Sequence, residues 1–570
     1  MPRYPETSAG THKRSPAMSR AHQQHRASAA AHYYRSRRVP ERLEEALTDI
    51  YHRGPDDVYG HLSCYFAAFS DPPVISDVRG RKVLDGAGKT TLEAEISCTV
   101  QTVNKRVCAA TVPMDAEPAP EVAGETQRQE SVETAIRWIQ ESIGPALKGM
   151  EPGNQSTIDQ LLRDYFKVMK QEDKEQEAEN ERAPSTPVSL PSPAPSPPSS
   201  KKKMSGKGKK AAALEKPLPP AEPPEVTTRG ALAVAAVSLA VAKSSAALQG
   251  LPLYSHIAAL KQQQPSSELM IPTPLISLLS CGKSSPGKLN LMKEILLIPR
   301  PGMTMAQSLD LAICLQTQIQ KQLEAQSKGG QSVTRMVSML GCLVVACERL
   351  EQPLELVREA CAALELELGR DVCLFINCAA HEIMDYNKGR YEIISGVWKS
   401  PDEMVDLYVD VVNKHPAIVA LLDPFRKEDR EQWEALGKAV GSKCYLIADV
   451  ASRSGSAPTC SGPILRLTNE TTVTDLLEAV QPMEEAKRLT IFGCSPEECV
   501  EESVVDLAVG LGVRFVSLGG LLRGERAAKY NRLLAIEEEL TRTGTLGLRG
   551  EFEFSALEND TNILNSQDSI

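Results

Sequence analysis

The sequence predicts an α/β protein in which a large (β/α)8 barrel follows a smaller α+β unit. From residue 229 onward, helical apolar runs alternate with short apolar runs typical of buried parallel strands. Upstream, residues 91–171 have the pattern of two strands followed by two helices. Between these parts, residues 172–226 are so rich in Pro, Lys and Glu that they cannot bury a core, which predicts a disordered insert.

Charge and cysteine usage restrict the class of protein. A net charge of −10 and a pI of about 5.6 give no support for a nucleic-acid partner. The 14 cysteines follow no disulfide framework, so we expect reduced thiols and a cytoplasmic location. The pairs in CSPEEC and CLVVAC are too widely spaced for a CxxC metal site and lack nearby histidines.

The amino-terminal segment is basic and is followed by an apolar hairpin. Residues 1–38 carry eight Lys and Arg against Glu6, and we expect a disordered tail there, although the composition faintly resembles a transit peptide. In residues 39–70, Leu43 and Leu47 share one helical face, Gly54 ends this helix, and Pro55 suits the first turn of the next. A hairpin this small cannot bury its own apolar face, so it should dimerise or pack on the rest of the chain.

The stretch VPERLEEALTDIYHRGPDDVYGHLSCYFAAF, residues 39–69, resembles the dimerisation and docking domain of type II protein kinase A regulatory subunits. This resemblance implies pairing into a four-helix bundle that binds an amphipathic helix of a kinase-anchoring protein. It also implies attachment to the cytoskeleton, as in cilia and sperm flagella. Packing of the hairpin on the body of the chain is the alternative.

Two pieces of the chain come before the barrel, an α+β piece over residues 75–171 and a helical piece over 227–265. In the first piece, strands 91–100 and 105–113 precede helices 130–150 and 155–171. The sequence DGAGKTT in this piece is not a phosphate-binding loop, because Val83 stands where the pattern needs Gly and a strand follows it. In the second piece, ALAVAAVSLAVA (231–242) is too short to span a membrane and predicts a buried helix.

The barrel is expected over residues 266–555, followed by a disordered tail, 556–570. The predicted strands are 373–380, 418–425, 444–451, 463–469, 489–495 and 514–520, and 270–350 has room for more.

Four sequences in these domains resemble the enolase, or phosphopyruvate hydratase, family. They are GLPLYSHIAAL (250–260), SPDEMVDLY (400–408), DPF (423–425) and GERAAKYNRLLAIEEEL (524–540). The resemblance implies an enolase-like barrel with a capping domain made of the pieces 75–171 and 227–265. It also implies a homodimer or a heterodimer with another enolase. The implied reaction is dehydration of 2-phosphoglycerate to phosphoenolpyruvate in glycolysis. In that reaction a Lys removes a carbon-bound proton and two Mg²⁺ ions hold the dianionic intermediate.

The family's three acidic metal ligands align with Asn377, Leu422 and Ala448. Asp423 and Asp449 lie beside the last two positions, and strand alternation predicts that both point away from the mouth. An amide and two alkyl groups do not balance a divalent ion, so we expect no metal cofactor, and Mg²⁺ only if the family activity is retained.

The other functional positions of the family also differ. The catalytic Glu aligns with Leu340, and the catalytic Lys aligns with Arg466, which keeps its proton near neutrality and cannot act as a base. A metal-binding loop serine aligns near Met114. The remaining substrate-binding positions align with Ser284, Cys494, Ser495 and Ser517.

One acid of the family's site matches, Glu294, for which a substrate role and a structural, paired role are equally open. Arg466 is expected to pair with Glu294, Asp423 or Asp449 rather than to catalyse. Three functions follow as hypotheses: a structural or interaction role, with no nucleic-acid or membrane partner; a hydratase of low activity, or one active only beside a competent enolase; and a small-anion binding module that uses Arg466 and Glu294.

Overall fold

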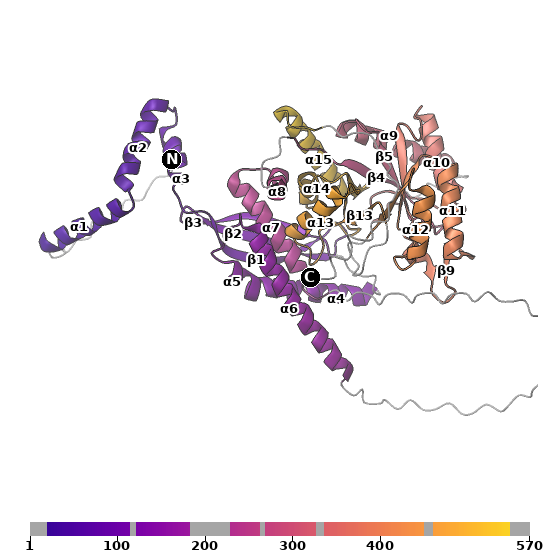
Figure 1. The fold of residues 1–570 in the computed structure, drawn as a ribbon, viewed down its shortest axis with the longest axis horizontal. Helices are drawn as coiled ribbons and strands as arrows, with labels where there is room; N and C mark the ends of the chain where they lie inside the picture. The colour runs from indigo at the N-terminus through magenta and orange to yellow at the C-terminus, as the bar shows by residue number, and fades with distance from the viewer. Residues whose placement is uncertain are drawn as a thin grey trace, which may run out of the picture. The chain divides into compact units, whose positions relative to one another are not determined.

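The computed structural model describes residues 20–114, 121–182, 228–262, 268–326, 336–449 and 460–547. Helices α1 to α3 belong to one compact unit. The chain from Pro73 onward, apart from residues 101–103, forms another. The ribbon is drawn in Figure 1. The expected tail 556–570 and residues 183–226 of the expected insert lie outside the described residues.

The amino-terminal unit holds helices α1 (Arg20–Ser36), α2 (Val39–Arg53) and α3 (Val58–Ala67). The expectation of a disordered tail is therefore wrong for residues 20–36. Gly54 adopts a left-handed conformation (φ 57°) and its N–H donates to the Ile50 carbonyl oxygen, which ends α2 as predicted. Asp57 caps α3 by accepting from Gly60 N, so Pro55 lies in the connection rather than in the first turn of α3.

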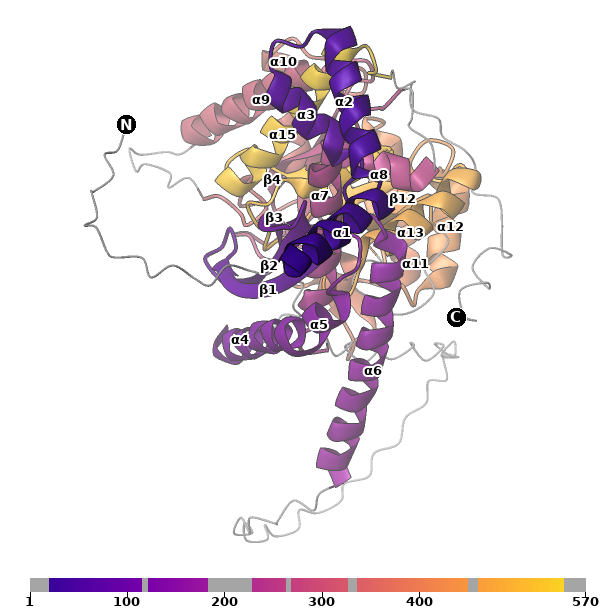
Figure 2. The ribbon, with the colours of Figure 1, turned by 90° about the vertical axis from the view of Figure 1, so that its left-hand side faces the viewer.

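The capping domain packs helices on a three-stranded sheet. The strands β1 (Val74–Leu84), β2 (Thr90–Val100) and β3 (Val103–Val112) are ordered β1-β2-β3, so the predicted pairing of the last two is present. Helix α4 (Glu121–Trp138) continues through a π-helical turn, η1 (Ile139–Ile143), into α5 (Gly144–Leu147). Helix α6 (Gln155–Arg182) extends through the acidic block that we had assigned to the insert, so that boundary was wrong. Figure 2 shows α6 running away from the sheet.

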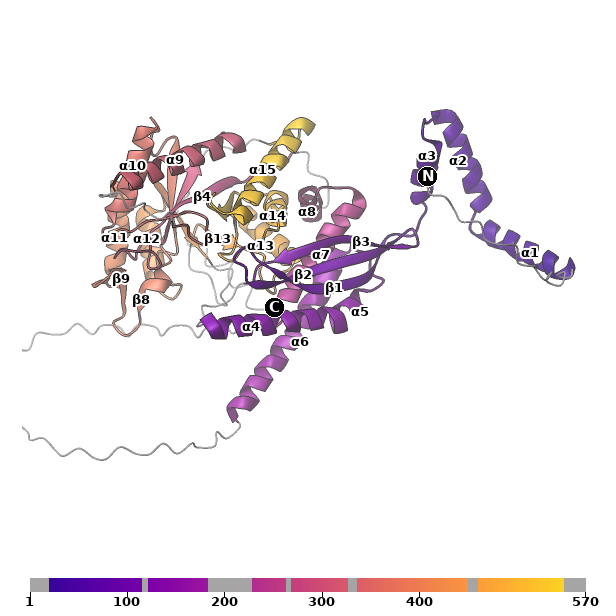
Figure 3. The same ribbon diagram turned by 180° about the vertical axis from the view of Figure 1, so that it is seen from behind.

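Helix α7 (Leu232–Gln249) is the buried helix that the Ala-rich run predicted. By length and apolar composition alone it could cross a membrane, but most of its side chains are buried within the protein. It packs against β2 and α6, and α8 (Leu253–Gln262) follows it. Figure 3 shows α7 running along the sheet. Helix α7 is thus part of the core that joins the capping domain's layers.

Eight strands close into a barrel with the order β4-β5-β7-β11-β12-β13-β14-β15, and β15 pairs with β4. A short strand, β6, pairs with β4 outside this ring. Neighbouring strands are parallel except at β5, which is antiparallel to both β4 and β7. The strand–helix alternation had predicted a wholly parallel sheet, so this expectation was wrong at β5. The strands are β4 (Thr273–Ser280), β5 (Glu294–Pro299), β6 (Leu343–Val344), β7 (Val372–Asn377), β11 (Ile418–Leu422), β12 (Tyr445–Ala448), β13 (Gly462–Leu465), β14 (Ile491–Gly493) and β15 (Phe515–Gly519).

Helices cover the outside of the barrel, as Figure 1 shows for α9 to α12. Capping boxes at Ser400 and Thr472 begin α11 and α13. A small sheet of β8 (Met384–Asp385), β9 (Arg390–Ile394) and β10 (Val397–Lys399) follows a 3₁₀ turn, η2 (Ala380–Ile383). The helices are α9 (Met305–Gln326), α10 (Glu351–Ala363), α11 (Pro401–Lys414), α12 (Arg430–Val440), α13 (Val473–Glu485), α14 (Ser503–Leu511) and α15 (Gly524–Thr543).

Candidate functional site: the mouth of the barrel

The candidate site is the rim of the barrel where the parallel strands end. Because β5 runs the other way, its first residue, Glu294, lies at this same rim and pairs in register with Asn377, the last residue of β7. Leu422 ends the next strand, β11, and also pairs with Asn377. Asp449 and Arg466 directly follow β12 and the next strand, β13. The fold thus brings together residues that lie up to 172 positions apart in the sequence.

Glu294 is buried, with 4% of its surface exposed. The Ser277 hydroxyl donates to Glu294 Oε1, and Asn377 Nδ2 donates to Oε2 at 3.4 Å. Burial raises the pKa of the Glu294 carboxyl, and these two hydrogen bonds oppose the rise. Sequence reasoning missed Ser277, although a serine within the apolar run TPLISLLS was a usable signal.

Leu422 packs into the interior of the barrel with Ala420 and Ile447, and 6% of its surface is exposed. It therefore places an alkyl group between the Asn377 amide on β7 and the Asp449 carboxylate beyond β12. The sequence assigned Leu422 to the second metal-ligand position, and the side chain does face the mouth.

Asp449 also faces the mouth. Tyr445 and Ile447 belong to the barrel-interior cluster, whereas Ala448 belongs to the core outside the barrel. Strand alternation therefore turns Asp449 inward. The expectation that it points away was wrong, because the alternation was counted from Ala448.

Asp449 and Arg466 form a bidentate ion pair, with Nη1 to Oδ1 at 2.7 Å and Nη2 to Oδ2 at 2.6 Å. This is one of the three pairings expected for Arg466. Asp423, at a left-handed φ of 45°, accepts from Asp449 N at 2.9 Å through its side chain. Both acids that survive beside the aligned metal positions are thus engaged within the protein.

The remaining predicted residues differ in where they lie. Ser517, two residues after the inward-facing Phe515, lies on the interior face of β15, whereas Ser284 is exposed in the loop after β4. Leu340 accepts from Gly520 N at 2.6 Å through its carbonyl oxygen. Met114 is buried in the main core. Ser517 alone of these four is placed on an inward-facing strand position.

The loop after β14 is fixed by the carboxy-terminal helix. Its first residue, Cys494, is buried, and burial raises the pKa of its thiol to about 12. Arg526 Nη2 donates to the carbonyl oxygens of Ser495 and Pro496 at 2.8 Å, and Lys529 Nζ donates to that of Cys499. Arg526 and Lys529 thus hold this loop on α15.

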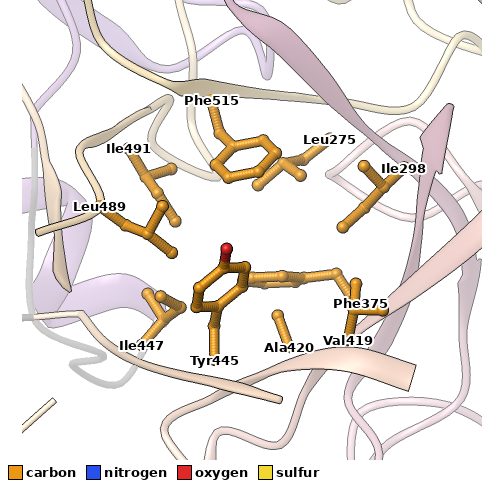
Figure 4. Close-up of a pocket in the computed structure, with 10 residues that line it drawn as sticks. All are labelled: Leu275, Ile298, Phe375, Val419, Ala420, Tyr445, Ile447, Leu489, Ile491 and Phe515. Atoms are coloured by element: carbon orange, nitrogen blue, oxygen red, sulfur yellow. The ribbon is translucent and has the colours of Figure 1, made fainter. Parts of the chain in front are cut away.

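Below the mouth, the interior of the barrel is apolar. Figure 4 shows ten side chains around a central cavity, and the Tyr445 hydroxyl supplies their one polar atom. At the mouth itself, Ser277, Glu294, Asn377 and Asp449 supply side-chain oxygens. Within the described residues, no group of three or more His, Cys, Asp or Glu side chains could hold a metal ion.

Family models match two segments of the chain. Residues 75–173 match "Enolase, N-terminal domain", and residues 268–550 match "Enolase, C-terminal TIM barrel domain". The family resemblance inferred from the sequence motifs is therefore confirmed.

Proteins called Enolase 4 are similar over nearly the whole chain. The one from Xenopus laevis is 55% identical, over 94% of this chain and 95% of its own. The one from Homo sapiens is 47% identical, over 92% and 90%, and the one from Danio rerio is 42% identical, over 90% of each chain. On these similarities and on its capping domain and barrel, the chain belongs to the enolase family.

Proposed function

We propose that this enolase-family protein does not carry out the family's magnesium-dependent dehydration and serves as a structural or interaction protein. The observation that carries the proposal is the row of side chains at the mouth. Asn377 and Leu422 occupy two of the aligned metal-ligand positions. Asp449, which follows the third aligned position, Ala448, is held by Arg466 through both carboxylate oxygens. Mg²⁺ takes oxygen ligands in octahedral array, usually with carboxylates among them. This donor set does not fit the ion, and we expect no metal cofactor.

The acid–base positions support the same proposal. A guanidinium bound to a carboxylate cannot remove a proton from carbon, and Leu340 offers no acid at the other aligned position. Glu294 remains, and its two hydrogen bonds are those of a paired structural acid. Because Asp449 neutralises Arg466, the geometry favours small-anion binding less than the sequence alone did.

Turnover of 2-phosphoglycerate by the purified full chain with Mg²⁺ tests the proposal. We expect no phosphoenolpyruvate above the level found for Glu294→Gln, a matched variant purified in the same way that exposes contaminating host enolase. Turnover that the substitution abolishes would establish a hydratase. Turnover that appears only after mixing with a competent enolase would establish the heterodimer alternative.

The interaction surface that we propose is the hairpin of α2 and α3. Several of its large apolar side chains are exposed, with Leu47 at 63%, Tyr51 at 84% and Tyr59 at 85%. Within the hairpin, His61 Nε2 pairs with Asp49 at 2.8 Å, and Arg42 lies 4.0 Å from the centre of the Phe69 ring. These contacts fix the angle between the helices and leave an apolar face for a second copy of the hairpin. A helix of a kinase-anchoring protein would then bind the pair and attach the protein to cytoplasmic cytoskeleton, including that of a flagellum.

Sedimentation of the full chain tests this surface. We expect Leu47→Asp to halve the mass of the particle and to abolish binding of an amphipathic anchoring-protein helix. Val168→Asp, at a similarly exposed apolar position on α6 (55%), is the matched control and should change neither. An unchanged mass together with unchanged peptide binding in Leu47→Asp would refute the docking role.

A further inference from the structure

A small cavity lies inside the barrel, at the end of the strands away from the mouth. On β4 the residue that lines it is Leu275, whereas Ser277, which is closer to the mouth, donates to Glu294. Because β5 runs the other way, its lining residue is Ile298, at the opposite end of the strand from Glu294. Phe515, the first residue of β15, also lines the cavity. The cavity is therefore separate from the side-chain oxygens of the mouth.

The small side chain of Ala420 accounts for this space. Ala420 on β11 is in register with Phe375 on β7 and with Tyr445 on β12, so a methyl group stands between two aromatic side chains (Figure 4). The interior of a barrel of this kind is ordinarily filled by layers of bulky side chains. At the level of Ala420 the layer is incomplete, and the gap is about the size of a water molecule.

The wall of the cavity is almost wholly apolar. Among its ten lining residues, the only polar side-chain atom is the Tyr445 hydroxyl oxygen. A water molecule in a protein interior typically makes about three hydrogen bonds, which this wall does not supply. While the cavity is empty, its lining atoms lack dispersion contacts on one side. A small apolar molecule restores those contacts and needs no hydrogen-bond partner.

Leu489 marks the side of the cavity that is nearest to solvent. The other nine lining residues are buried, whereas Leu489, just before β14, is partly exposed. Displacement of this side chain is a local motion that admits a small molecule without unfolding the barrel.

We propose that this cavity is a binding site for a small apolar molecule of the size of dioxygen or xenon. The affinity comes from dispersion contacts with the wall and from the transfer of an apolar solute out of water. Charged molecules are excluded, because a charge placed among these side chains would have no partner. The site goes beyond the proposed interaction role, and it does not depend on whether the mouth retains hydratase chemistry.

Dissolved dioxygen is the probe that tests the site in the full chain in solution. Dioxygen is paramagnetic and speeds the nuclear relaxation of methyl groups that it approaches. Ile298, Ile447 and Ile491 line the cavity and are at most 2% exposed. Ile96 and Ile143 in the capping domain, at 0% and 1%, are equally buried and serve as matched controls. We expect dioxygen to speed the relaxation of the three lining Ile δ1 methyl groups more than that of the two controls.

Ala420→Val is the variant that fills the gap, with a β-branched side chain that suits a strand. It should abolish the excess relaxation at the three lining isoleucines and raise the unfolding temperature. Ala110→Val, at a buried position of β3 in the capping domain, is the matched control and should keep the excess.

The comparison of lining and control isoleucines uses the unmodified protein, so it decides the matter even if Ala420→Val fails to fold. Equal enhancement at all five isoleucines would overturn the proposal. So would excess relaxation that persists in folded Ala420→Val, or an ordered water molecule in the cavity of a crystal of the protein.

Discussion

At the scale of single residues, the pair Arg466–Asp449 determines the charge of the barrel mouth. Both side chains are about four-fifths buried, with 15% and 20% exposed, so neither charge is well hydrated. Their bidentate contact compensates for the lost hydration only while both partners are present. The pair therefore fills and neutralises a pocket that would otherwise leave Asp449 as an isolated inward-facing anion.

Replacing one partner should show this dependence. Arg466→Met is expected to lower the free energy of unfolding by about 2 kcal/mol, because it leaves a largely buried carboxylate unpaired. The double variant Arg466→Met with Asp449→Leu should regain most of the loss, since two apolar side chains need no partner. Urea denaturation of both variants measures the effect, and a single variant as stable as wild type would contradict the pairing.

Glu294 gives a pH dependence whose sign can be checked. Its pKa in the folded protein is raised above the ordinary value of 4.5, so its contribution to stability is fully present below that value and is lost as pH rises through the folded pKa. Glu294→Gln keeps an acceptor for Ser277 and removes the ionisation. The variant should gain stability relative to wild type as the pH is raised from about 4.5 to 7 in urea titrations. A loss of stability by the variant relative to wild type over that range would contradict the raised pKa.

Asp449 marks the limit of what the sequence could predict about the site. Both Glu294 and Arg466 were placed at the mouth by their motifs, and both lie there. The direction of Asp449 depends on which residue of β12 faces the interior, and the segment CYLIADVA is apolar on both faces. In a strand that is buried on both sides, the sequence does not show which alternate residues face the barrel interior, so the direction of Asp449 is known only from the structure.

At the scale of elements, the apolar runs predicted where strands occur but not whether each strand runs parallel or antiparallel to its neighbours. Each of the six predicted barrel strands overlaps an observed strand, but nothing in EILLIP, the sequence of β5, shows that it runs antiparallel. Helix α6 was predicted too short because its acidic block was taken as low complexity. Glu, Lys, Gln and Ala favour helix, and extending a helix that has already formed needs no new nucleus.

Helix α15 owes its fixed position to a buried cation. Lys529 is fully buried, donates to the carbonyl oxygens of Cys499 and Glu525, and lies 3.8 Å from the Glu498 carboxylate. Lys529→Met should lower the free energy of unfolding by about 3 kcal/mol, since it removes the cation beside the buried Glu498 carboxylate. Arg542→Met, at an exposed position of the same helix, is the control and should change it by less than about 0.5 kcal/mol. Equal effects in chemical denaturation would contradict this account of α15.

At the scale of the whole molecule, the barrel has an apolar interior below a mouth in which Asn377 and Leu422 stand at aligned positions of acidic metal ligands. Restoring acids should restore a response to metal if the frame is otherwise intact. The variant Asn377→Asp with Leu422→Glu and Arg466→Lys places three carboxylates, with Asp449, on adjacent strand ends. We expect its unfolding temperature to rise on addition of MgCl₂, because an ion that binds only the folded state stabilises it. No rise in a folded variant would mean that more than these ligands is missing.

The unfolding temperature of the unmodified protein as a function of Mg²⁺ concentration tests the central claim most directly. A site occupied at 100 times its dissociation constant would add about 2.7 kcal/mol to the stability of the folded state. We predict no saturable rise up to millimolar Mg²⁺, with or without 2-phosphoglycerate. A saturable rise that Glu294→Gln abolishes would contradict the account, since it would place a divalent ion in the mouth of the barrel.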